Sequence, residues 1–431
     1  MNEYDSNRIS DLIKKFGYKK TNDVNNIDCY ILNTCHIREK ATEKVYHDIG
    51  RLKKKYKNKK KPIVLITGCV AQAENKEMIR RENYIDAVIG PQSYQNIPEI
   101  LKKIQKKVKK FDFTDFDVIE KFDQINKLEN FESKISSYLT IQEGCDKFCN
   151  FCVVPFTRGP EYSRPFKEVV TEAKILASNG AKEITLLGQN VNSYGRDLKI
   201  DNKSRPYFSQ LLHKLNEIDG LERIRFTSPH PKDFKEETIN AVNTLNKVCN
   251  QIHIPLQSGS SEILAKMHRG YNKQKFIQKV DMIKKIIPDV SLTTDIIVGF
   301  PGESDSDFKD TMDIVKYVEF DSIYMFQFSP RPGTRAQDME SSFISKDIIK
   351  ERFKHLKDVQ TDISEKKLKR FVGTKQTLLI DKQSKKNDKV LTGKIDSGQI
   401  THIDNKYVSI GDMVQVKVTD STPFYLKAEL I

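Results

Sequence analysis

The sequence predicts a three-part α/β protein: an N-terminal α/β parallel-sheet domain, a partial TIM-like (β/α)6 barrel and a small C-terminal β-barrel. Three observations predict this fold class. Apolar runs alternate with helical patterns through residues 1–112, the alternation repeats six times in residues 135–368, and residues 369–431 carry short strands separated by Gly and Asp turns. A chain of 431 residues is long enough for two or three such domains.

The N-terminal domain is predicted from four elements. Apolar residues at helical spacing predict a helix over Asp5–Phe16, and short apolar runs predict strands at Cys29–Asn33, Pro62–Thr67 and Ile85–Gly90. Strands that alternate with helices in this way form a parallel sheet. Residues 113–134 mix acids and aromatics without a clean period, and we interpret them as a linker.

The barrel is predicted from six strands with helical stretches between them, including Lys167–Asn179 and Ser304–Val318. The expected strands are Ser137–Gln142, Glu183–Leu187, Arg223–Thr227, Gln251–Pro255, Ser291–Val298 and Ser322–Phe328. In such barrels the chemistry lies at the carboxyl ends of the strands. Polar turns or loops follow five of these strands, so we expect the functional residues on that face, although any single Gly or Pro turn is often mere punctuation.

The C-terminal part begins after a long helix predicted from about Lys346 to Arg370. The five short strands that follow fit a small closed barrel of the oligonucleotide-binding kind. The formal net charge of +14 points to a polyanionic partner. Two basic runs, Arg51–Lys61 and Leu101–Lys110, concentrate this charge, but a charge run on a helix can equally be a solvated face.

Cysteine usage and the N-terminal residues indicate the compartment. Seven cysteines, three of them clustered, argue against a disulfide framework and for a reducing environment. The N-terminal residues have no apolar signal core, and no apolar stretch approaches the length of a membrane span. We therefore expect a cytoplasmic protein without a membrane partner.

The three clustered cysteines are Cys145, Cys149 and Cys152, in the run Gly144–Cys152. Their spacing of four and then three can wrap one metal cluster, and iron–sulfur clusters are usually held by four thiolates. No fourth cysteine follows nearby, so a four-iron cluster would keep one iron open to a small molecule. Structural zinc usually takes four ligands in CxxC-like pairs, and a buried inert cysteine is the other alternative.

This CxxxCxxC loop, with Phe151 before its third cysteine, resembles that of the radical S-adenosylmethionine superfamily. The resemblance implies a [4Fe-4S] cluster whose open iron chelates S-adenosyl-L-methionine. One electron from the reduced cluster then cleaves the sulfonium to a deoxyadenosyl radical. Such a radical can take hydrogen from a carbon that no acid or base activates.

Further motifs narrow the resemblance and cover nearly the whole chain. They are similar to those of the MiaB-type tRNA branch of the radical S-adenosylmethionine methylthiotransferases: Asn33–Glu39 (NTCHIRE), Gly68–Gln72 (GCVAQ), Thr140–Asp146 (TIQEGCD), Val154–Gly159 (VPFTRG) and Leu187–Asn192 (LGQNVN). That family converts N6-isopentenyladenosine at tRNA position 37 to its 2-methylthio form. It has an N-terminal domain with a second [4Fe-4S] cluster, a radical barrel and an RNA-binding TRAM barrel. The implied partners are this tRNA, a low-potential electron donor and a sulfur donor, and we expect a monomer.

The resemblance also implies the site residues. Cys145, Cys149 and Cys152 would bind the radical cluster, and Cys35 and Cys69 the auxiliary one. No catalytic residue is assigned beyond these ligands. For the cofactor we expect contacts from Gln189 and Asn190 to the methionine moiety, from Gln257 and Ser258 to the ribose, from the backbone at Gly299 to the adenine, and from Phe151. His230, between two prolines, can equally be rigid turn structure.

The chain departs from the family pattern at its start. The family has a third N-terminal cysteine in a segment like Gly-Cys-Gln-Met-Asn, whereas this chain begins at Met1. Cys29 lies six residues before Cys35 on one predicted strand, about 20 Å away at roughly 3.3 Å per residue, so we assign Cys29 to the core, as we do Cys249. We expect an incompletely ligated auxiliary cluster and favour a misassigned start codon over a degenerate copy.

Three alternatives remain at this point. Sister enzymes of the family modify threonylcarbamoyladenosine in tRNA or an aspartate of a ribosomal protein. The pairs Arg38–Glu39, Ala71–Gln72 and Gln189–Asn190 favour the isopentenyladenosine branch over both. The third alternative is a non-catalytic RNA-binding protein whose cysteines hold zinc, which would be colourless where a cluster is brown.

Overall fold

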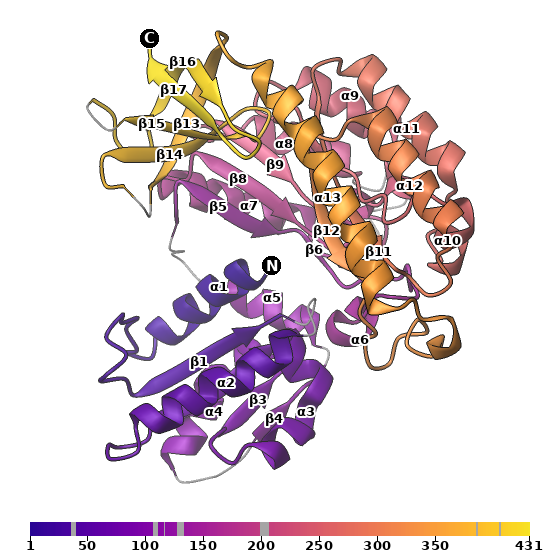
Figure 1. Ribbon diagram of the computed structural model, residues 1–431. Coiled ribbons are helices and arrows are strands. Elements are labelled where there is room, and N and C mark those ends of the chain that lie inside the picture. The colour runs from indigo at the N-terminus through magenta and orange to yellow at the C-terminus, as the bar shows by residue number, and fades with distance from the viewer. Residues whose placement is uncertain are drawn as a thin grey trace.

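A computed structural model describes residues 1–35, 40–106, 111–115, 117–126, 133–198, 207–384, 387–404 and 407–431. Figure 1 shows three bodies: the N-terminal domain in indigo to purple, a half-barrel in magenta to orange above it, and the C-terminal barrel in yellow beside the half-barrel. None of the helices in these described ranges is both long and apolar enough to cross a bilayer.

The N-terminal domain is a four-stranded parallel sheet in the order β1-β2-β3-β4. Its strands are β1 (Cys29–Thr34), β2 (Ile63–Gly68), β3 (Ala87–Ile89) and β4 (Phe111–Phe113), and its helices α1 (Asn2–Lys14), α2 (Lys40–Lys55), α3 (Cys69–Arg81) and α4 (Ile97–Gln105). β2 is apolar over Ile63–Ile66 because a central strand of a parallel sheet is buried on both faces. In the β1–β2 register Thr34 stands opposite Gly68.

The interpretation of residues 113–134 as a linker is wrong for its described part. β4 includes Phe113 and extends the sheet, and α5 (Val118–Asn126) buries Lys121, Phe122 and Ile125 completely. Val118, Phe122 and Ile125 do stand at helical spacing, a local signal that the linker interpretation overlooked among the surrounding acids. Their burial depends on α1 and the half-barrel, which the local sequence does not reveal.

The half-barrel contains the six expected strands in two parallel three-stranded sheets, β5-β8-β9 and β10-β11-β12, bridged between Ile224 and Val248. The strands are β5 (Ser136–Thr140), β8 (Glu183–Leu187), β9 (Arg223–Phe226), β10 (Gln251–His253), β11 (Ser291–Val298) and β12 (Ser322–Gln327). The covering helices are α7 (Phe166–Ser178), α8 (Phe208–Asn216), α9 (Glu236–Thr244), α10 (Ser261–Lys266), α11 (Lys273–Ile286), α12 (Asp305–Val318) and α13 (Lys346–Lys369). The predicted αβ alternation is thus confirmed.

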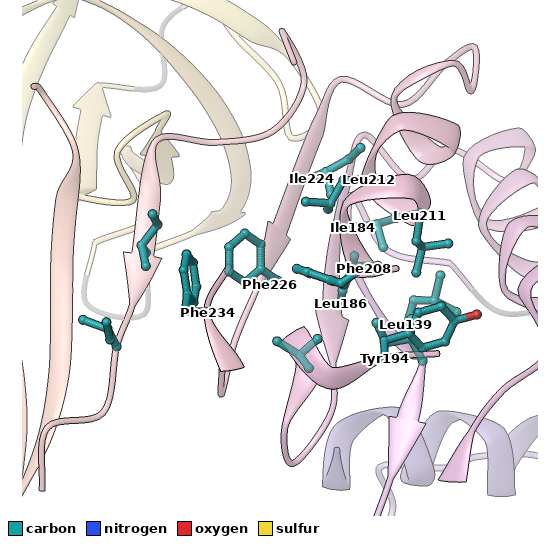
Figure 2. Close-up of a cluster of buried hydrophobic side chains, with 14 of the residues drawn as sticks. Leu139, Ile184, Leu186, Tyr194, Phe208, Leu211, Leu212, Ile224, Phe226 and Phe234 are labelled. Carbon is teal, nitrogen blue, oxygen red and sulfur yellow. The ribbon is translucent and has the colours of Figure 1, made fainter. Parts of the chain in front are cut away.

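Apolar side chains of strands and helices form the core of this half-barrel. Figure 2 shows Leu211 and Leu212 of α8 beside Ile184 and Ile224 of the sheet, all fully buried. Further along, the Phe226 ring of β9 meets Phe208 edge-on at 5.2 Å between centroids. Each such side chain contributes about 1.5–3 kcal/mol on burial, so this layer stabilises the packing of the helices on the sheet.

The C-terminal body is a closed barrel in the order β13-β14-β15-β17-β16. Its strands are β13 (Lys375–Gln383), β14 (Val390–Ile395), β15 (Ile400–Asp404), β16 (Met413–Ser421) and β17 (Leu426–Leu430). Two buried arginines of β9 anchor it by donating hydrogen bonds to its backbone carbonyls. Arg223 donates to the carbonyls of Thr377 and Lys394 at 2.7 and 2.6 Å, and Arg225 to those of Ile395 and Asp396 at 2.9 and 2.8 Å.

Candidate functional site

The cysteine loop follows the first strand of the half-barrel. After β5, the short strand β6 (Gln142–Glu143) pairs with β7 (Tyr162–Ser163), and the loop with helix α6 (Val154–Arg158) lies between them. Gly144 has φ +74°, and a Cβ there would lie 1.8 Å from the Pro160 carbonyl oxygen, so only glycine fits. The Cys145 amide donates to the Gly159 carbonyl at 3.2 Å. The loop is therefore closed back on the residues that follow it.

The three thiols of the loop lie within electrostatic range of one another. Burial raises the pKa of Cys145 to about 11 and that of Cys152 to about 12, and the neighbouring Cys149 adds to both. Cys149 itself is buried. Thiols are the donors that iron–sulfur clusters take, and the three in this loop fit a four-iron cluster that keeps one iron open. Among the described residues no three His, Cys, Asp or Glu side chains form a group that could hold a single metal ion.

The turn after β8 lies beside the loop through Gln142 and Asp233. The Gln142 side-chain oxygen accepts hydrogen bonds from the backbone amides of Gln189 and Asn190 at 2.9 and 3.1 Å. Asn190 Nδ2 donates to Asp233 Oδ2 at 2.8 Å, and Lys147 Nζ of the cysteine loop lies 2.5 Å from the same oxygen. Asp233 therefore ties the predicted cofactor residue Asn190 to the cysteine loop.

Several buried polar atoms of this region have no hydrogen-bond partner. They are Asn190 Oδ1, Gln189 Oε1 and His230 Nε2. Burial, followed by the Arg269 charge, lowers the pKa of His230 to about 2, so its imidazole is neutral. Because His230 Nδ1 accepts from the Lys232 amide, the proton sits on Nε2. A buried polar atom without a hydrogen bond lowers the stability of the folded state. The three unpartnered atoms therefore fit a polar ligand that supplies the missing hydrogen bonds.

The other predicted cofactor residues are placed differently. Phe151 packs with Phe300, next to Gly299, in a small apolar cluster. Gly299 has φ +78° and packs against Ile349 of α13. Gln257 also has positive φ, +71°, and bridges to Ile296 of β11. Ser258 is fully buried, and its hydroxyl accepts from the Ser260 amide, so it is already engaged within the fold.

Cys35 and Cys69 directly follow β1 and β2 at the carboxyl end of the N-terminal sheet. Each is the residue after a register partner, Thr34 or Gly68, and adjacent strands lie about 4.8 Å apart. Both thiols are half-buried. The Met1 amino group is also here: its burial lowers its pKa, and Asp5 and Cys35 partly offset that effect.

The other two cysteines, Cys29 and Cys249, pack in or against the core and lie outside both proposed cluster sites. Cys29 begins β1 and packs against the main core, where burial raises its pKa to about 12. Cys249 is buried beside Arg225 and its pKa is also raised to about 12 by burial. These placements agree with core cysteines.

Sequence reasoning missed a buried charge network beside the Cys35–Cys69 edge. Arg158 Nη2 donates to Asp5 Oδ2 at 2.7 Å and Lys121 Nζ to Glu143 Oε1 at 2.5 Å, while Arg158 Nη1 lies 3.3 Å from the same Glu143 oxygen. All four side chains are at most 3% exposed. Cys69 adds to the negative field around Arg158. Arg158 and Glu143 stand in quoted motifs, but nothing local signals that they are buried and paired.

Three residue pairs favoured the isopentenyladenosine branch in the sequence, and the structure describes two of them. Arg38–Glu39 lies outside the described residues. Ala71 is buried on α3, and Gln72 Nε2 donates to the Thr114 carbonyl at 2.7 Å, which gives this pair a structural position.

Comparisons with known proteins cover the whole chain. Residues 139–315 match the radical SAM superfamily, residues 1–90 the uncharacterized protein family UPF0004, and residues 369–431 the TRAM domain. A tRNA-2-methylthio-N(6)-dimethylallyladenosine synthase of Pelagibacter ubique is 47% identical over 98% of this chain and 93% of its own length. The enzyme of that name from Francisella tularensis subsp. holarctica is 41% identical over 100% of this chain and 97% of its length.

One solved structure is similar in fold. The radical S-adenosylmethionine methyltransferase TsrM from Kitasatospora setae, with cobalamin and a [4Fe-4S] cluster bound, has a TM-score of 0.57 and 13% sequence identity. The match covers 78% of this chain and 74% of that one.

Proposed function

The chain belongs to the family of the tRNA-2-methylthio-N(6)-dimethylallyladenosine synthases, and we propose from that premise that it transfers a methylthio group to C2 of N6-isopentenyladenosine at tRNA position 37. The observation that carries this proposal is full-length identity of 41–47% to enzymes of that name. The three-cysteine loop at the carboxyl end of the first barrel strand supports it.

The radical cluster would be held by Cys145, Cys149 and Cys152. When bound, the cluster supplies the electron that cleaves S-adenosyl-L-methionine and so generates a radical for C–H activation. The protein's part is binding and orientation. Asn190 Oδ1 is open to accept from a cofactor amino group and the His230 Nε2–H is open to donate to a carboxylate, and both side chains are buried.

A second cluster would be held by Cys35 and Cys69 at the edge of the N-terminal sheet. The parallel register supports this, because it brings the two strand ends side by side. A sulfur donor would replenish this site and a low-potential electron donor would reduce the radical cluster. Iron counting tests the assignment. Replacing both residues, Cys35→Ala with Cys69→Ala, should lower the bound iron and leave about four irons per chain in the three-cysteine loop. Unchanged iron would contradict it.

The tRNA would contact the C-terminal barrel, with the protein acting as a monomer. The net charge of +14 favours RNA, and Tyr407 and Phe424 of this barrel are 86% and 71% exposed. Exposed aromatic rings on such barrels stack on unpaired bases. Because phosphate contacts release counterions, tRNA affinity should fall steeply as salt rises.

Nucleoside mass spectrometry tests the reaction. tRNA from a strain that lacks the gene should contain N6-isopentenyladenosine without its 2-methylthio form, and a reintroduced copy of the gene should restore the product. The Cys149→Ala variant should not. Persistence of the 2-methylthio form in the deletion strain, or loss of 2-methylthio-threonylcarbamoyladenosine instead, would contradict the proposal.

A further inference from the structure

The turn between α10 and α11, residues 267–272, packs against the cysteine loop. The Asn150 amide donates to the Met267 carbonyl at 3.1 Å, and Asn150 Nδ2 donates to the Lys266 carbonyl at 2.7 Å. His268 Nδ1 lies 3.2 Å from the Phe148 carbonyl oxygen. These contacts hold the backbone of the loop on both sides of Cys149, and none of them reaches a thiol.

Arg269 differs from its neighbours because it reaches the sulfur. Its Nη1 donates to Cys149 Sγ at 3.3 Å. The rest of the guanidinium is fixed: Nε donates to the Tyr271 hydroxyl at 3.1 Å and Nη2 to the Pro255 carbonyl at 3.3 Å. Tyr271 in turn donates to the Pro255 carbonyl at 2.9 Å. Arg269 is only 6% exposed, so its charge is not screened by water.

A buried cation that donates to a ligand sulfur has a specific electronic effect. Hydrogen bonds to the sulfurs and the net charge around an iron–sulfur cluster set its reduction potential. Reduction adds one negative charge, and a nearby positive charge stabilises the reduced state more than the oxidised state. The Arg269–Cys149 bond also becomes charge-assisted when the thiol is ionised as a ligand.

We propose that Arg269 is a positioning residue that raises the reduction potential of the radical cluster through its hydrogen bond to Cys149. The inference rests on the proposed function, because it requires that Cys145, Cys149 and Cys152 hold a cluster. Arg269 brings this potential within reach of a biological electron donor. The turn around it provides the fixed geometry, with Tyr271 and the end of β10 as its supports.

The test is a redox titration of the full chain followed by electron paramagnetic resonance, without cofactor. All proteins carry Cys35→Ala and Cys69→Ala, so that only the loop contributes a signal. Arg269→Gln should shift the midpoint potential to a more negative value, because a charge and a donor are lost. Arg269→Lys, which keeps the charge, should shift it less. His268→Ala, which removes a contact of the same turn without touching sulfur, should leave it unchanged.

Two outcomes would overturn the proposal. One is an Arg269→Gln variant with the iron content and midpoint potential of the parent. The other is a His268→Ala shift as large as that of Arg269→Gln, which would show that loop packing sets the potential. If Arg269→Gln fails to hold iron, the Tyr271→Phe variant provides the test, because it keeps the Arg269 charge but removes a support of its side chain. An unchanged midpoint potential in both Tyr271→Phe and Arg269→Lys would then refute the assignment. A parent protein without any cluster would instead refute the proposed function.

Discussion

The two cysteine sites of this protein are built in opposite ways. Cys145, Cys149 and Cys152 lie in one loop whose backbone closes on itself and on the following residues. Cys35 and Cys69 come from two separate strands, and only the register that places Thr34 opposite Gly68 brings them together. A site contained in one loop is visible in the spacing of its residues, whereas a site assembled from strand ends depends on the fold.

The charges around the two sites differ as well. Near the loop, Arg269 donates to Cys149 and Lys147 pairs with Asp233. Near the strand ends, a buried network of two cations and two carboxylates joins α1, α5, β6 and α6. That network ties the N-terminal domain to the half-barrel, so the second site lies at a junction between domains. The comparison predicts that substitutions at the two sites affect different properties of the protein.

The largest effect is expected at the loop. Cys149→Ala removes one of the three proposed ligands, so the protein should lose the cluster's iron and form no 5′-deoxyadenosine from S-adenosyl-L-methionine. Chromatography of the reaction products measures this. Cys249→Ala, which changes a buried cysteine away from both sites, is the control and should retain the activity. If Cys149→Ala formed deoxyadenosine at the parent rate, Cys149 would not be needed to cleave the cofactor, and the proposed difference between the two sites would be wrong.

The next effect separates the two sites directly. Cys69→Ala should still cleave the cofactor but transfer no methylthio group, because the change affects only the proposed second cluster. Deoxyadenosine and modified nucleoside are measured in one reaction. Equal loss of both products would mean that the sites are one functional unit, and intact methylthio transfer would mean that Cys69 is not a ligand.

The charge network should matter for stability. Arg158→Met leaves Asp5 and Glu143 with one cation between them, and breaking a buried pair in this way costs about 3–5 kcal/mol. Urea denaturation of the cluster-free protein should show this loss in the N-terminal domain. Arg80→Met is the matched control, because Arg80 pairs with Glu77 on the exposed face of α3. A loss no larger than that of the control would show that the network is dispensable.

The smallest effect concerns thiol ionisation in the cluster-free loop. With pKa values of about 11 for Cys145 and about 12 for Cys152, the thiolate fraction of each stays small at neutral pH and rises about tenfold per pH unit. Iodoacetamide labelling followed by peptide mass spectrometry should therefore accelerate continuously from pH 7 to 10. A plateau near pH 9 for both peptides would contradict the raised pKa values.

Much of the fold could be predicted from the sequence, because most of its signals are local. Glu183–Leu187 and Ser291–Val298 are strands with the bounds that the pattern predicted, and the long helix before the C-terminal barrel ends within one residue of the expected position. The failure was the described part of residues 113–134, where α5 buries Lys121 and two apolar residues against other parts of the chain. Val118, Phe122 and Ile125 follow helical spacing, but nothing local indicates that Lys121 is buried with them.

The candidate site divides along the same line. The cysteine loop and Asn190 could be singled out because the loop spacing and the turn after a barrel strand are local features. Arg269, Asp233 and the Asp5–Arg158 pair could not, since each acts through a partner far away in the sequence. Their roles depend on burial and on distances that only the assembled fold provides.

The central claim is that the three-cysteine loop holds a cluster with an iron open to S-adenosyl-L-methionine. The direct measurement is electron paramagnetic resonance of the anaerobically reconstituted, reduced chain with Cys35→Ala and Cys69→Ala, recorded with and without the cofactor. We expect about four irons per chain, a cluster signal that changes when the cofactor is added, and loss of both in Cys149→Ala. A colourless protein that binds zinc, or a cluster signal indifferent to the cofactor, would contradict it.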